Sequence, residues 1–164
     1  MSLWAITVGR TRRKSMKTKE FCGFTFIHAG DFYINTIKSP KKYKWGDANK
    51  TYDHITTCIR FSEENLPDKV EQAYIITVGN DVVYVGEFSN SLRDRWLKTD
   101  NYIWHNKDHL IYAELTRKAE VALWLTKDPY VDISGGLKIN ISKSIEHHIL
   151  KNNSLAWNQR HNKR

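Results

Sequence analysis

The chain contains few of the residues that mark fibrous, low-complexity or disulfide-stapled proteins. Eight glycines and three prolines among 164 residues exclude a collagen-like or low-complexity protein. Its two cysteines, Cys22 and Cys58, form no CxxC pair, so neither a zinc knuckle nor a thioredoxin-type site is expected. Because 40% of the residues are hydrophobic and 12% are aromatic, the composition also argues against intrinsic disorder. We therefore expect a folded protein with a sizeable core and reduced cysteines.

Long apolar runs are also missing from the sequence. No run approaches the about 18 apolar residues that a membrane-spanning helix needs. The apolar stretch that precedes the first basic cluster is too short for a signal peptide. These two absences predict a soluble, cytoplasmic protein.

Acidic side chains are scarce at the beginning of the chain. Residues 1–50 contain 11 basic and three acidic side chains, whereas residues 51–164 contain 15 of each, so the net charge of +8 lies in the first third. This asymmetry predicts a surface that binds a polyanion. Basic side chains neutralise phosphates, and nearby aromatic side chains can stack on bases. The candidate DNA contacts in this region are Arg10, Arg12, Arg13, Lys14, Lys41, Lys42, Lys44 and Trp45.

The acidic, proline-containing segment 62–72 separates two regions of different composition. We expect a basic, strand-containing extension over residues 1–70 and a second domain with a basic tail over residues 71–164. The extension is predicted to contain strands at 3–8, 21–37 with a break at 29–31, and 52–61. The second domain is predicted to begin with a hairpin of 73–78 and 82–88 and a helix capped by Ser89 or Asn90. A strand at 109–115, a helix at 116–127, a turn at 132–136 and a helix from Ser144 to about Lys151 are predicted to follow. The expected fold class is α+β, with a small central antiparallel or mixed sheet flanked by helices.

Five side chains follow one another in an order that is typical of a known catalytic family. Tyr74 and Tyr84 lie ten residues apart on the two strands of the hairpin, and Arg95 lies on the helix that follows. Glu146 lies on the last helix, and Asn158 comes twelve residues later. The arrangement resembles the GIY-YIG nuclease family, with Gln72-Ala73-Tyr74 and Tyr84-Val85-Gly86 in the places of its two tripeptides. The resemblance covers about residues 72–160.

The resemblance implies an Mg²⁺-dependent DNA endonuclease that hydrolyses phosphodiester bonds in double-stranded DNA, with another divalent cation such as Mn²⁺ as an alternative metal. Within the family, a type II restriction enzyme is the favoured interpretation, and a homing-type or phage-encoded endonuclease is an alternative. A nucleic-acid-binding protein that has lost turnover, and an RNA-processing or RNA-binding protein, stay open. A palindromic target would call for a homodimer, because a two-fold site matches a two-fold protein.

The resemblance also implies a role for each candidate catalytic residue. Tyr74 would orient or activate the attacking water with help from Tyr84. Arg95 would clamp the scissile phosphate through paired N–H donors. Glu146 would hold the metal, with phosphate oxygens and waters completing its coordination. Asn158 would support the site.

Several residues compete for these roles or extend them. Arg93 and Arg95 are about 200° apart on a helix, so only one can face the tyrosines. The resemblance favours Arg95, because the family often places a bulky residue directly after its arginine, here Trp96. Arg93, Lys98 and His105 are candidate phosphate contacts. Glu87 and Glu120 compete with Glu146. The adjacent residues His147 and His148 diverge by about 100° on a helix, so they are not expected to chelate one ion together.

Overall fold

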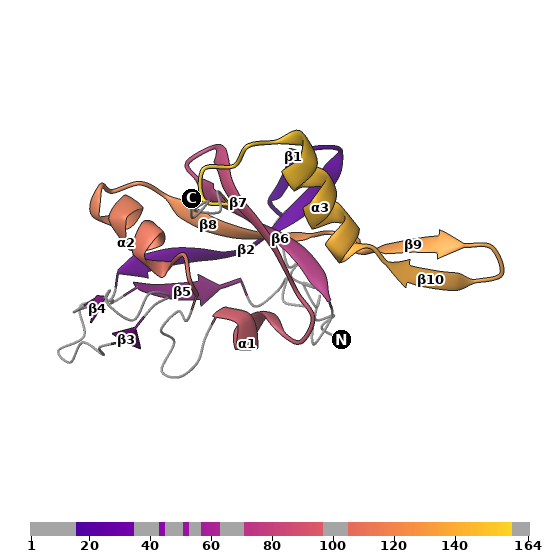
Figure 1. The fold of residues 1–164 in the computed structure, drawn as a ribbon, viewed down its shortest axis with the longest axis horizontal. Helices are drawn as coiled ribbons and strands as arrows, with labels where there is room; N and C mark the ends of the chain where they lie inside the picture. Colours follow the sequence, from indigo (N-terminus) through magenta and orange to yellow (C-terminus); the bar gives the residue numbers. More distant parts are fainter. Residues whose placement is uncertain are drawn as a thin grey trace, which may run out of the picture.

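The computed structural model describes residues 16–34, 57–62, 71–96 and 105–158, together with the backbone of 43–44 and 51–52. Among these residues the protein is α+β, as predicted, and strands predominate (Figure 1). The strands are β1 (Thr18–Phe21), β2 (Phe24–Ile34), β3 (Tyr43–Lys44), β4 (Thr51–Tyr52), β5 (Thr57–Phe61), β6 (Gln72–Val78), β7 (Asp81–Phe88), β8 (Val121–Thr126), β9 (Tyr130–Ile133) and β10 (Leu137–Asn140), and the helices are α1 (Leu92–Trp96), α2 (Asp108–Thr116) and α3 (Ser142–Asn152).

A six-stranded sheet forms the centre of the described structure. Its strands follow the order β1-β2-β8-β6-β7, and β5 also pairs with β2, beyond the part of β2 that pairs with β1. Every pairing in this sheet is antiparallel. Strand β7 therefore lies at one edge, and one of its sides has no strand partner among the described residues. This edge carries the candidate site.

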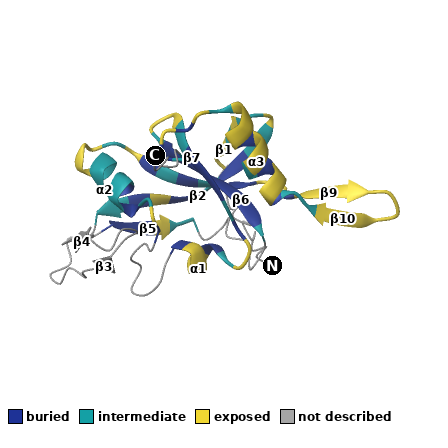
Figure 2. Ribbon diagram, viewed as in Figure 1, coloured by how far each residue is buried: buried dark blue, intermediate teal, exposed yellow. Residues whose placement is uncertain are grey.

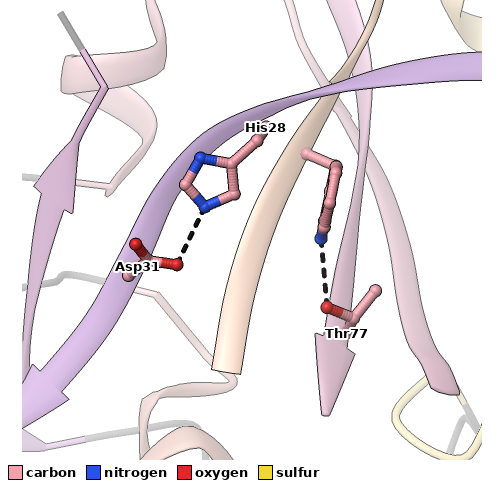
Figure 3. Close-up of polar contacts among 4 residues, drawn as sticks. His28, Asp31 and Thr77 are labelled. Carbon is pink, nitrogen blue, oxygen red and sulfur yellow. Dashed lines mark hydrogen bonds and ion pairs between the residues drawn. The ribbon is translucent and has the colours of Figure 1, made fainter. Parts of the chain in front are cut away.

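Strands from both sides of the predicted domain boundary belong to this one sheet. Strand β2 pairs with β8, and β8 pairs with β6. Side chains also join the three strands (Figure 3): the Trp124 indole N–H donates to Thr77 Oγ1 at 3.0 Å, and the His28 ring packs edge-on against Trp124. His28 also hydrogen-bonds Asp31 at 2.8 Å. The change in charge along the chain thus does not divide the sheet, while residues 63–70, where the boundary was placed, lie outside the described ranges.

The sheet has a buried layer on each face (Figure 2). On one face, Tyr74 and Ile76 pack with Leu92 and Trp96 of α1 and Ile111 of α2. On the other face, Ile75 and Val85 pack with Ile145 and Ile149 of α3. Because successive strand residues point to opposite faces, the apolar run of β6 is buried on both sides. The helices thus hold β6 and β7 between them.

The prediction of a strand at 109–115 followed by a helix at 116–127 is wrong, because the two element types are exchanged. Residues 108–116 form α2, with Ile111 fully buried and Leu115, one turn later, packed against the core. The helix ends in a turn in which Lys118 takes a left-handed φ of 62°. Residues 121–126 then form β8, which is paired on both sides. A strand that is buried on both faces of its sheet is apolar throughout, so its sequence does not distinguish it from a buried helix.

Other boundaries shift by a few residues. Ser91, not Ser89 or Asn90, caps α1, because its Oγ accepts the Asp94 N–H at 3.0 Å. The last helix begins at Ser142, whose N–H donates to Asn140 Oδ1 at 2.9 Å, and not after Ser144. Strand β2 runs on through 29–31, where its pairing with β8 merely shifts register. The predicted strand at 3–8 lies outside the described residues.

Strands β9 and β10 form a hairpin that projects from the body of the protein (Figures 1 and 2). The sequence predicted only its turn, which contains Gly135 and Gly136. Val131 pairs with Ile139 and Ile133 with Leu137, so these four exposed apolar side chains share one face. Elsewhere in the described part, neither Cys22 nor Cys58 belongs to a disulfide, and no helix is both long and apolar enough to cross a membrane.

Candidate active site

The register of β6 and β7 places the two tyrosines on one face of the sheet. Tyr74 pairs with Gly86, and Tyr84 pairs with Ile76, so the tyrosines are diagonal neighbours. Their ring centroids are 6.0 Å apart. Tyr74 is fully buried, at 0% exposure, whereas Tyr84 retains 8%. Sequence spacing predicted the pair, but only the register shows that both rings lie together.

Gly86 makes room for this pair. A Cβ atom at position 86 would lie 2.6 Å from Tyr74 Oη and 3.0 Å from Tyr84 Cε1. Tyr74 has no space to withdraw, because Phe88 and Trp96 surround its ring. A glycine is therefore required opposite Tyr74 for the two rings to lie on this face.

Arg95, and not Arg93, faces the tyrosines. The Arg95 Nε–H donates to Tyr74 Oη at 3.4 Å. Arg93 lies over the Phe61 ring, with its guanidinium carbon 5.3 Å from the ring centroid. Two residues on the one-turn helix α1 thus point in different directions, as helical geometry requires. Trp96, buried beside them, anchors the helix against Tyr74.

His105 completes the hydrogen bonds of Tyr74, a role that sequence reasoning missed. Its Nδ1 accepts the Lys107 backbone N–H at 3.2 Å, so the neutral ring carries its proton on Nε2. That Nε2–H donates to Tyr74 Oη at 3.0 Å. Trp96 stacks on the imidazole, with centroids 4.2 Å apart and an angle of 16° between the planes. No motif marks this residue, which comes from the segment before α2.

These contacts affect the pKa values of the two tyrosine hydroxyls differently. Burial raises the pKa of Tyr74 well above its usual value, and the neighbouring Tyr84 raises it further, against the opposing effect of Arg95. Burial also raises the pKa of Tyr84, but Arg95 and the hydrogen bond from Tyr74 lower it. The same Tyr74–Tyr84 hydrogen bond thus favours ionisation of Tyr84 and disfavours that of Tyr74. Because Tyr74 Oη already accepts from His105 and Arg95, its O–H is the donor to Tyr84. The pKa of Tyr84 still lies above its usual value, because burial outweighs these donors.

His105 should make the protein less stable in acid. Burial, with the charges of Arg95 and Lys107, holds the pKa of His105 well below its usual value of 6.5. The unfolded chain binds a proton near pH 6.5 while the folded protein does not, so the free energy of unfolding should fall as the pH drops below about 6.5, by at most about 1.4 kcal/mol per pH unit. Urea unfolding at several pH values measures this slope. His105→Gln should remove it, and an equal slope in both proteins would contradict the assignment.

Glu146 and Glu87 approach the site from the other face of β7. Burial and the charge of Glu87 raise the pKa of Glu146, while Arg95 lowers it. Glu87 also raises the pKa of Arg95, together with the tyrosines and against the effect of burial. A polar hollow of about 330 Å³ beside the end of β7 is lined by both Glu87 and Arg95. The two carboxylates and the guanidinium thus interact around the edge of this strand.

This pair of carboxylates fits a hard divalent cation such as Mg²⁺. Glu87 Oε2 is buried and has no hydrogen-bond partner among the described residues. Carboxylate oxygens are the ligands that Mg²⁺ prefers, and it commonly keeps several waters. The described residues contain no group of three or more potential ligands. Glu146, with Glu87 beside it, would therefore hold a cation whose other ligands come from phosphate and water.

Asn158 fastens the open edge of β7 between Tyr84 and Gly86. Its Oδ1 accepts the Val85 N–H and its Nδ2 donates to the Val85 carbonyl, both at 2.8 Å. The Trp157 N–H donates to the Val83 carbonyl at 2.9 Å. Leu155 and Trp157 belong to the cores on opposite faces of the sheet, so this segment crosses the edge. The position fits the supporting role expected for Asn158.

Asn158→Asp should weaken this contact while keeping the side-chain shape. The carboxylate still accepts the Val85 N–H, but its second oxygen then faces the Val85 carbonyl, an acceptor against an acceptor. We expect a loss of about 1–3 kcal/mol in the free energy of unfolding. Thermal unfolding measures the effect, with Asn80→Asp in the exposed turn between β6 and β7 as the control. Equal stability of the two variants would show that the contact of Asn158 with the Val85 backbone does not stabilise the protein.

Most of the candidate DNA contacts lie outside the described residues. Arg93 is described and its side chain is exposed. Lys44 belongs to β3, of which only the backbone is described. The candidates for which no structure is described are Arg10, Arg12, Arg13, Lys14, Lys41, Lys42, Trp45 and Lys98.

Comparison with known proteins identifies no relative of this chain. No protein-family model matches it, and neither a curated protein nor a solved structure matches it. Its function must therefore be inferred from the residues themselves.

Proposed function

We propose that the protein is a Mg²⁺-dependent DNA endonuclease of the GIY-YIG type, most similar in organisation to a type II restriction enzyme. One observation supports this proposal above the others. Two tyrosines and one arginine are in contact at the edge of β7, and Glu146 of α3, far from them in the sequence, lies near enough for its charge to act on Tyr84 and Arg95. These are the residue types that phosphodiester hydrolysis needs: hydroxyls for a water, a cation for the phosphate and a carboxylate for a metal.

In this proposal Tyr84, and not the buried Tyr74, faces the attacking water. Tyr74 holds Tyr84 in place, because its hydroxyl accepts from His105 and Arg95 and donates to Tyr84. The donors around Tyr84 lower the cost of negative charge on its oxygen as the water loses a proton. The roles expected from sequence order are thereby exchanged between the two tyrosines.

Arg95 and Glu146 act on the phosphate from two directions. The Arg95 guanidinium, beside the polar hollow at the end of β7, stabilises the negative charge that builds on the phosphoryl oxygens. A cation held by Glu146 would supply Lewis-acid stabilisation of the phosphate and of the leaving oxygen. Asn158 keeps the strand between these groups in place. A palindromic target would require two copies of the site related by a two-fold axis.

Cleavage of supercoiled plasmid DNA tests the proposal directly. The purified chain should convert the plasmid to linear or nicked forms in Mg²⁺ or Mn²⁺ and leave it intact in EDTA. Sequencing the cut ends would give the target and the stagger together. DNA binding without cleavage, over several DNAs and salt concentrations, would refute the nuclease proposal and favour a binding protein on the same fold. Cleavage of RNA but not DNA would change the substrate class.

Arg95→Ala should lower turnover far more than Arg93→Ala. Removing a preorganised donor to a developing negative charge costs about 10²–10³-fold in rate. Arg93 lies over Phe61 and serves as the matched control on the same helix turn. Single-turnover cleavage at saturating DNA measures the difference. Equal losses in the two variants would mean that neither arginine acts at the reacting phosphate.

A further inference from the structure

Helix α3 presents a second functional surface beside Glu146. Lys143, His147 and Lys151 recur every four residues, so they form one stripe along the helix. All three are exposed, whereas Ser142, Ile145 and Ile149 of the same helix are buried. The stripe therefore lies on the solvent side of α3.

The stripe borders an open hollow that offers only neutral or positively charged side chains. The hollow has a volume of about 440 Å³ and is lined by Lys143, Ser144, His147, His148 and Lys151. The His148 ring packs edge-on against Phe24, with centroids 5.7 Å apart, which fixes that side of the surface against β2. Lysine ammonium, hydroxyl and imidazole groups are donors to phosphate oxygens. Acidic side chains are absent from this lining.

The stripe is continuous with the candidate active site. Glu146 follows Lys143 by three residues, which makes the two side chains neighbours on the helix surface. Successive residues of the stripe rise by about 6 Å along the axis. Lys143 lies on the N-terminal side of Glu146, and His147 and Lys151 lie on its C-terminal side. A strand with a phosphate near Glu146 would thus have Lys143 as its nearest basic neighbour, with the rest of the stripe farther around the helix.

We propose that the Lys143–His147–Lys151 stripe binds the phosphate backbone of the DNA strand that flanks the scissile bond. This proposal rests on the proposed nuclease function, because it is the placement of a phosphate at Glu146 that gives the stripe its ligand. The stripe contacts no reacting atom, so it contributes to affinity and to the direction of the strand. An acidic peptide would interact with the same charges, but the adjacent site for a phosphodiester favours DNA.

The test compares two double variants that lose the same charge. Lys143→Gln/Lys151→Gln removes both lysines of the stripe, and Lys127→Gln/Lys138→Gln removes two exposed lysines elsewhere. Binding of a fluorescent DNA duplex in EDTA is measured over a series of salt concentrations. Each lost phosphate contact lowers the slope of log K against log salt by about 0.9, so the stripe variant should lose about 2 in slope and the control should not. The variant Lys143→Arg/Lys151→Arg should keep the slope of the parent.

The outcomes separate this proposal from the nuclease proposal. If the stripe variant has the same salt slope as the control variant and the parent cleaves DNA, only the stripe proposal is refuted. If the stripe variant has a lowered slope but the parent never cleaves DNA, the stripe is supported as a DNA-binding surface and the nuclease proposal is refuted. If the parent shows no salt-dependent binding to DNA, both proposals fail.

Discussion

Glu146→Gln should abolish Mg²⁺-dependent cleavage, with a loss of at least about 10³-fold in single-turnover rate, or about 4 kcal/mol. The substitution keeps the size of the side chain and removes the negative charge that a divalent cation needs. Because α3 is anchored by Ile145 and Ile149 and not by Glu146, the fold should survive. The rate should be measured at saturating DNA and over a series of Mg²⁺ concentrations, so that weaker metal binding is separated from slower chemistry.

Glu120→Gln is the matched control for this experiment. Glu120 precedes β8, is exposed and was the competing carboxylate on sequence grounds. The Glu120→Gln variant should retain the activity of the parent.

Glu87→Gln is the informative third variant, since Glu87 lies close enough to raise the pKa of Glu146. Full activity in Glu146→Gln, together with loss in Glu87→Gln, would move the metal site to β7 and refute the assignment to Glu146.

Gly86→Ala should inactivate the protein through a steric effect. The new methyl group would lie 2.7 Å from Tyr74 Cζ and 2.6 Å from its Oη, closer than side-chain atoms approach in folded proteins. Overpacking of this kind costs about 1–3 kcal/mol. The relief must come from movement of Tyr74 or Tyr84, which would break the hydrogen bonds to His105 and Arg95. We expect cleavage to fall by more than the loss of folded protein explains.

Gly23→Ala separates the two effects of adding a methyl group. Gly23 has a φ of +82°, and a Cβ atom at this position would have no other atom within 4 Å, so the substitution strains the backbone without touching the site. Both variants should lose stability in thermal unfolding, but only Gly86→Ala should lose activity at a temperature where both are folded. Normal activity in Gly86→Ala would show that the tyrosine pair tolerates displacement.

The residues of the candidate site were more predictable than the fold around them. Tyr74, Tyr84 and Arg95 follow one another on a short hairpin and the helix after it, where local spacing limits the possible positions. Helical geometry allowed only one of Arg93 and Arg95 to face the tyrosines, the resemblance favoured Arg95 through the bulky Trp96 after it, and the structure places Arg95 against Tyr74. The spacing of these three residues along the chain was therefore sufficient to predict that they lie together.

The features that depend on distant contacts were not predictable. The strand character of β8 comes from its neighbours β2 and β6, which the sequence of β8 itself does not specify. The hydrogen bond from His105 to Tyr74 joins residues that are 31 positions apart, and no sequence motif marks His105. Glu87 was a competing candidate on sequence grounds, but its approach from the face opposite Tyr84 depends on how the site wraps around the edge of β7.

The clamp of Asn158 on Val85 has a consequence for synthesis of the protein. The two residues are 73 positions apart, so β7 emerges from the ribosome long before its edge contact exists. At about 5–20 residues per second, the delay amounts to several seconds. During that interval the tyrosines and Arg95 are present, but Glu146 and the clamp are not. A nascent chain would therefore bring the tyrosines, Arg95 and Glu146 together only as α3 and the segment after it dock.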